Sequence, residues 1–135
     1  MARPLRTRPV TSAQVRAFAA KAHEYVEAAA NELEAGRCIA ATSLAIHAAI
    51  NAADAVCGGR VGRRITGEDH DRVLELLKQS GRDGADVARD LRGLLPLKTR
   101  TEYEPDLVAS GIATRAVERA QRCVGIARAV AAGTR

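Results

Sequence analysis

The stretch CIAATSLAIHAAINAADAVC at residues 38–57 decides the fold that this sequence predicts. Alanine is its most frequent residue, and alanine is the strongest helix former. Its isoleucines, Ile39, Ile46 and Ile50, recur at intervals of seven and four, which marks a buried seam along a helix. We therefore expect a buried helix that stops at the two glycines that follow, Gly58-Gly59.

The same helical spacing of apolar residues continues on both sides of this stretch. It predicts four further helices over about residues 12–35, 66–79, 83–95 and 107–131. No run of useful length alternates apolar and polar residues with a period of two, so we expect no sheet. The fold class predicted is all-α, an antiparallel up-down bundle of four or five helices joined by short connections.

Single residues set the expected ends of these helices. Thr11 and Gln14 have the spacing of a capping box, and Gly36 is placed to end the first helix. Thr66 is expected to cap the third helix. Pro96 has no amide proton, and we expect it to kink or break the fourth helix.

Length and charge set the expected organisation of the chain. The 135 residues allow one helical domain, over residues 11–132, preceded by a disordered basic arm at 1–10. The formal net charge is +5, with basic residues in excess over 1–64 and 107–135 and acidic residues in excess over 65–106. This pattern is typical of contact with a phosphate backbone or of head-to-tail self-association.

Cysteine usage and the lack of an apolar leader indicate the compartment. The cysteines, Cys38, Cys57 and Cys123, form no Cys-x-x-Cys pair and are odd in number, as expected of reduced thiols. The weakly polar stretch 38–56 contains His47 and Asp54, so we interpret it as a buried helix and expect no membrane contact. We expect the protein to be cytoplasmic.

Ionisable residues in the predicted second helix lie on one polar edge. Ser43, His47 and Asp54 are spaced four and seven apart, which places them on one side of a largely apolar helix. His47 and Asp54 lie roughly 10 Å apart along the axis, too far for a direct bond. The chain has no His-x-x-x-His or Glu-x-x-His pairs, so we expect neither a metal nor another cofactor.

A glycine-rich basic segment at 58–64 contains Arg60, Arg63 and Arg64. It follows a helix and lacks the Gly-Lys-Ser/Thr end of a phosphate-binding loop, so we interpret it as a flexible basic loop that could contact an anion. His70 comes shortly after it, among acidic residues at the start of the third helix. Its imidazole is a candidate acid or base near neutral pH.

Several motifs in order carry a family resemblance. An alanine-rich first helix is followed by AIHAAINAADA at 45–55 and GEDH at 67–70. A leucine-rich helix then ends in LKTRTEY at 97–103, before a second alanine-rich helix. This arrangement, over about residues 11–131, resembles the HEPN domain family and is most similar to its bacterial branch.

The resemblance implies an up-down helical bundle that is commonly a dimer, and either RNA cleavage or RNA binding. It also implies a partner protein of the minimal nucleotidyltransferase type, as in toxin–antitoxin pairs. In catalytic members an arginine precedes a histidine by four to six residues. Arg100 matches that arginine, but no histidine follows it in the chain; Tyr103 lies in the neighbourhood instead, and Glu102 and Glu104 would repel a phosphate. His70 and Arg100 are therefore the candidate catalytic pair.

Three functions remain open. The first is a module that dimerises and binds RNA or a nucleotidyltransferase-type antitoxin, without complete catalytic machinery. The second is a metal-independent, toxin-like endoribonuclease using His70 and Arg100. The third is a helical scaffold or dimerisation domain. The residues expected at the edge of the site are His47, Asp54, Arg60, Arg63, Arg64, Lys98, Glu102 and Tyr103.

Overall fold

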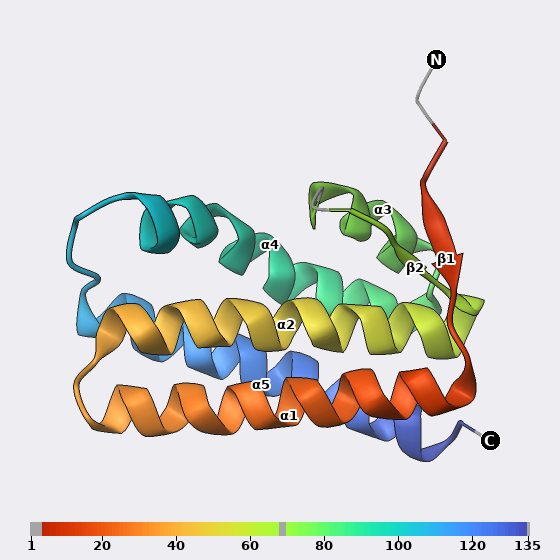
Figure 1. Cartoon of the computed structure of the whole chain (residues 1–135), viewed down its shortest axis with the longest axis horizontal. Coiled ribbons are helices and arrows are strands. Elements are labelled where there is room, and N and C mark those ends of the chain that lie inside the picture. Colours follow the sequence, from red (N-terminus) through yellow and green to blue (C-terminus); the bar gives the residue numbers. More distant parts are fainter. Residues whose placement is uncertain (1–3, 68–69, 135) are drawn as a thin grey trace.

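A computed structural model describes residues 4–67 and 70–134 (Figure 1). Helices dominate it, so the prediction of an all-α bundle is confirmed. The long helices are α1 (Ser12–Glu34), α2 (Cys38–Val61), α4 (Gly81–Tyr103) and α5 (Ser110–Ala132). The short elements are the strands β1 (Thr7–Pro9) and β2 (Arg63–Ile65), the 3₁₀ turn η1 (His70–Arg72) and helix α3 (Val73–Lys78).

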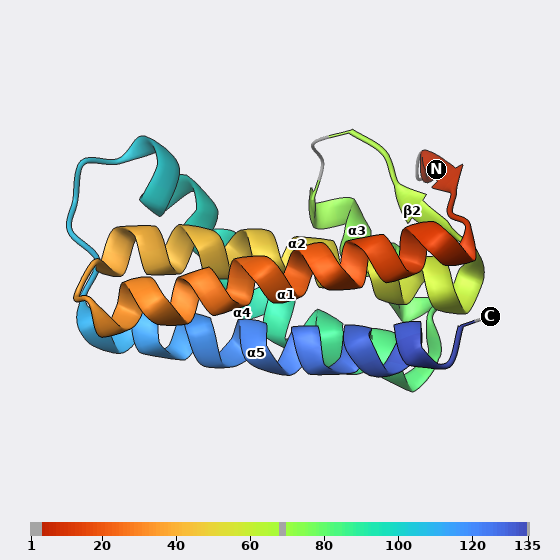
Figure 2. The same cartoon turned by 60° about the horizontal axis from the view of Figure 1, so that its bottom comes forward.

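Helix α2 lies at the centre of the bundle and packs against α1, α4 and α5. Figures 1 and 2 show α1, α2 and α5 running side by side, while the end of α4 turns away from them. By length and composition α2 could also cross a membrane. However, 56% of its most apolar window is buried inside the bundle, and the core helix of a soluble protein passes the same test.

The ends of α1 form as the sequence predicts. The Gln14 amide donates to Thr11 Oγ1 (3.1 Å), and the Thr11 amide donates to Gln14 Oε1 (2.9 Å), which completes the capping box. At the other end Gly36 has a φ of +79°, a left-handed conformation that ends the helix at little cost for a residue without a Cβ. Both predictions are confirmed.

The two glycines expected to end α2 lie inside it, so that prediction is wrong. A Cβ on Gly58 would lie 2.7 Å from Val10 Cγ1, and a Cβ on Gly59 would collide with the Val130 side chain of α5. These glycines therefore allow the chain to pack closely. The helix ends instead at Gly62, which has a φ of +72° and whose amide donates to the Gly58 carbonyl (3.0 Å).

A two-stranded ribbon corrects two expectations, the absence of a sheet and, for residues 7–9, the disordered arm. Strands β1 and β2 pair antiparallel, with Arg8 opposite Arg64 and Pro9 opposite Arg63. Two backbone hydrogen bonds flank the paired strands: the Val10 amide donates to the Gly62 carbonyl (2.9 Å), and the Thr66 amide donates to the Arg6 carbonyl (3.0 Å). Hydrogen-bonded pairs alternate along such a ladder, so Pro9 falls where no amide donor is needed.

Helices α3 and α4 also differ from the predictions. Thr66 extends the ribbon and does not cap a helix, and α3 begins at Val73. Helix α4 continues through Pro96 to Tyr103, so of the kink or break expected there the break is excluded. Leu94 is fully buried and Leu97 packs against the core, so tertiary packing holds the helix on both sides of the proline.

The contact between α4 and α5 depends on a buried carboxylate. Asp90 accepts from Arg122 Nε (3.0 Å) and Nη2 (2.8 Å), and from Arg119 Nη1 (3.3 Å). A Cβ on Gly93 would lie 2.7 Å from Arg119 Cζ, so the glycine leaves room for that guanidinium. Three charge-assisted hydrogen bonds from two arginines to one carboxylate fix the register of the two helices.

Gly59 and Gly125 provide a matched test of packing between α2 and α5. We expect Gly59→Ala to destabilise the protein by about 1–3 kcal/mol, because its methyl group would overlap Val130. Gly125→Ala on α5 should stabilise it by up to about 1 kcal/mol, because the new Cβ meets no atom within 4 Å and alanine favours helix. Urea denaturation of both variants measures the difference, and equal effects would contradict this packing.

Candidate functional site

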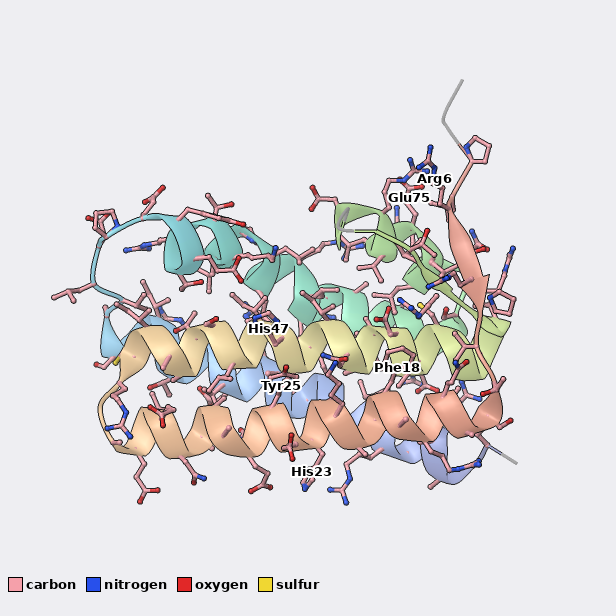
Figure 3. All side chains as sticks on the ribbon, viewed as in Figure 1. Arg6, Phe18, His23, Tyr25, His47 and Glu75 are labelled. Atoms are coloured by element: carbon pink, nitrogen blue, oxygen red, sulfur yellow. The ribbon has the colours of Figure 1, made fainter. Side chains whose placement is uncertain are left out.

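His47 lies where α1, α2 and the last turns of α4 meet. Its ring stacks on Tyr25 of α1, with centroids 5.6 Å apart and an interplanar angle of 28°. Its Nε2 lies 3.7 Å from Glu102 Oε1 of α4, and the side chain is 44% exposed. Figure 3 shows Tyr25 between α1 and α2, with His47 on the side of α2 toward α4.

Glu102 is shared between two basic groups. Its Oε2 lies 3.7 Å from Lys98 Nζ one turn earlier on α4, while its Oε1 faces His47. Both distances are those of ion pairs and exceed a normal hydrogen bond. The carboxylate therefore offsets the positive charge of Lys98 and disfavours binding of an anion beside His47.

Arg100, Tyr103 and His70 do not join His47 in a described contact. Arg100 is half-buried on α4, and its side chain forms no ion pair or hydrogen bond within residues 4–67 and 70–134. Tyr103 ends α4 with 74% of its surface exposed. The side chain of His70 lies outside the described residues, so its pairing with Arg100 stays a prediction.

Asp54 belongs to a second cluster, where β2 lies beside α2. It is half-buried, and burial raises the pKa of its carboxyl from the ordinary 3.8 to about 7, against the opposing attraction of Arg64 and Lys21. The Arg64 guanidinium lies over the Phe18 ring of α1, 5.3 Å from its centroid. The sequence placed Asp54 and His47 on one edge of α2, but their side chains interact with different elements.

The basic segment 58–64 is not the flexible loop that its glycines suggest. Its first residues complete α2, and Arg63 and Arg64 form most of β2. Arg60 binds Asp83 Oδ2 of α4 through Nε (3.0 Å) and Nη2 (2.5 Å). Arg63 is exposed and donates to Thr7 Oγ1 (3.4 Å). Arg60 is thus neutralised within the protein, whereas Arg63 has a neutral partner.

Two aromatic residues of α1 that the sequence analysis did not place at a site, Phe18 and Tyr25, are part of these clusters. Both pack partly against the core, and the ring of each also contacts an ionisable side chain, Arg64 over Phe18 and His47 stacked on Tyr25. They are seven residues apart, so both lie on the same side of α1. The position of Lys21 between them could have indicated that this side is partly exposed.

The thiols and carboxylates provide no further chemistry in the described residues. Burial raises the pKa of the Cys57 and Cys123 thiols to about 12, so both remain protonated at neutral pH. Within residues 4–67 and 70–134, no group of three or more His, Cys, Asp or Glu side chains is arranged to hold a metal ion. The chemistry of the site is therefore that of imidazole, carboxylate and guanidinium groups.

The titration of Asp54 leads to a pH-dependent prediction. Its folded-state pKa exceeds the unfolded value, so its contribution to stability is present below about pH 4 and is lost as the pH rises to about 7. We expect Asp54→Asn to stabilise the protein by about 1–2 kcal/mol at pH 8, and by much less at pH 4, after allowing for its partial exposure. Chemical denaturation at both pH values measures this, with exposed Asp106→Asn as the control for loss of one charge. A gain independent of pH would contradict it.

Comparison with known proteins matches almost the whole helical bundle to one protein family. The family model described as HEPN domain matches residues 15–132. This range contains α2 to α5, most of α1 and all of the predicted site residues. The resemblance drawn from the sequence motifs is thereby confirmed. No curated protein matches the chain.

Proposed function

This chain belongs to the HEPN domain family, and from that premise we propose that it binds RNA as a homodimer without cleaving it. The family supports a nucleotide- or RNA-related helical module. The observation that favours binding over cleavage is the position of Glu102 between His47 and Lys98. An RNA partner is consistent with the expected cytoplasmic location.

Metal-independent cleavage of RNA needs a base for the ribose 2′-hydroxyl and positive charge at the phosphate. Beside His47, Glu102 supplies negative charge in place of that positive charge. A phosphate about 4 Å from this carboxylate would be repelled by on the order of 4 kcal/mol in a surface environment. The His47 cluster is therefore suited to hold α1, α2 and α4 together and poorly suited to bind the reacting phosphate.

The proposed dimer uses the end of the bundle where α1 turns into α2. The large apolar side chains exposed in the described part of the chain are Ile39, Tyr103 and Leu107. Ile39 and Leu107 line one groove of about 830 Å³, between that turn and the α4–α5 connection. Exposed apolar side chains gathered at one place are typical of a protein interface. A second copy of this chain is the proposed occupant.

RNA binding without cleavage is tested with labelled single-stranded RNA in EDTA. We expect a shift in fluorescence anisotropy that weakens steeply with salt, because phosphate contacts release counterions. The RNA should remain intact on a denaturing gel after prolonged incubation. Cleavage that is lost in both His70→Ala and Arg100→Ala would overturn the proposal in favour of the endoribonuclease. Absence of binding would leave the scaffold function.

The dimer is tested by light scattering after gel filtration. We expect twice the monomer mass of 14.3 kDa for the wild type. Leu107→Ser should shift the protein to the monomer, because it removes an exposed apolar side chain of the groove. Exposed Arg115→Ser on α5 is the control and should remain dimeric. A monomeric wild type that forms a complex with a nucleotidyltransferase-type protein would assign the groove to that partner.

A further inference from the structure

Two arginines face each other on the β1–β2 ribbon. Arg8 and Arg64 are directly opposite in the antiparallel register. Residues paired in this way project from the same face of a ribbon, with Cβ atoms about 5 Å apart. Like charges directly opposite each other on a ribbon are destabilising. The protein therefore carries an electrostatic cost at this place that a bound anion would relieve.

Arg6 extends this pair along β1. It precedes Arg8 by two residues, so both side chains lie on the same face, about 6.8 Å apart along the strand. The burial pattern agrees with this alternation, since Arg6 and Arg8 are exposed whereas Leu5 packs against the core. On the other strand Ile65 is buried and takes the ribbon face opposite to Arg64. Figure 3 shows Arg6 at the outer end of β1, away from α1 and α2.

The positive charge continues from the ribbon onto α1. Arg64 is held over the Phe18 ring, which brings its guanidinium beside that helix. Lys21 lies one turn beyond Phe18 and is exposed, and its charge acts together with that of Arg64 on Asp54. Within the part of the chain that the structure describes, Arg6, Arg8 and Lys21 form no ion pair. Arg6, Arg8, Arg64 and Lys21 form a surface that we call the ribbon face.

We propose that the ribbon face binds consecutive phosphates of a single-stranded RNA, an inference that rests on the RNA binding proposed above. A row of cations at the repeat of a strand fits a chain of phosphates better than it fits one isolated anion. Arginine is suited to this because its guanidinium can bind a phosphate through two parallel N–H groups. The contacts go to the backbone, so binding depends little on base sequence.

The ribbon face and the His47 cluster differ in how their basic groups are paired with acids. In the His47 cluster, the Glu102 carboxylate lies close to both His47 and Lys98. On the ribbon face Asp54 acts on Arg64 and Lys21. Arg6 and Arg8 form no ion pair among the described residues, so these two outer arginines should carry most of the affinity for an anion.

The test compares two double variants that remove the same charge. Arg6→Gln/Arg8→Gln removes two cations of the ribbon face, and Arg92→Gln/Arg115→Gln removes two exposed cations from α4 and α5. Anisotropy titrations of a labelled single-stranded RNA at several salt concentrations give both affinity and its salt slope. We expect the ribbon variant to bind about tenfold more weakly and to lose about 1.4 from the slope of log K against log salt. The control variant should change affinity by less than about threefold.

Two further variants separate loss of positive charge from misfolding of the protein. Arg6→Lys/Arg8→Lys should restore most of the binding, because the positive charges return. If the double variant does not show a wild-type melting transition, Arg8→Gln alone should reduce the slope by about 0.7. Wild-type RNA binding with equal affinity and slope in the ribbon and control variants would overturn the ribbon face while leaving the proposed function intact. A wild type that does not bind RNA would overturn both.

Discussion

The close approach of α2 to its neighbours is the constraint on which the other features of the molecule depend. Its buried positions are mostly alanines, which are fully enclosed by α1, α4 and α5 (Ala41, Ala45, Ala48, Ala49, Ala52, Ala53 and Ala55). Such small side chains bury little apolar area each, so the helices must come very near one another to gain dispersion contacts. The approach is closest at Gly58 and Gly59, because neither position has room for a Cβ at its interface. Stability in this bundle depends on shape more than on large apolar side chains.

This packing also decides where polar chemistry can lie. The positions between Ala41 and Gly58 that are not buried form one narrow stripe of α2, and they are Ser43, Leu44, His47, Ile50, Asn51 and Asp54. Between Ala41 and Gly58, every partly exposed polar group that α2 presents to other elements lies on this stripe. His47 meets Tyr25 and Glu102 there, whereas Asp54 faces the charges of the ribbon and α1. One helix edge thus serves two separate polar clusters.

The sequence predicted correctly those features that depend on residues close together in the chain. The first helix, its capping box at Thr11 and its end at Gly36 depend on residues within a few positions of one another, and those predictions are confirmed. The ribbon was missed because three-residue strands are too short to show a period-two pattern, and the contact of Arg64 with Phe18 depends on that ribbon. Gly59 was misread as a helix end, and Pro96 does not break α4, because tertiary packing outweighs the usual effect of these residues on helices.

The two clusters differ in electrostatic character, and this difference gives the proposed function its physical basis. Near His47, Glu102 balances Lys98 at short range, so the imidazole lies in a nearly neutral setting. On the ribbon, Ile65 anchors β2 in the core from one face while the arginines project from the other. The anchoring fixes the spacing of the cations before any ligand arrives, which lowers the entropic cost of binding a polyanion. An RNA strand held there would place its phosphates beside guanidinium groups and apart from the histidine on α2. The geometry thus separates the cations of the ribbon from the imidazole of His47.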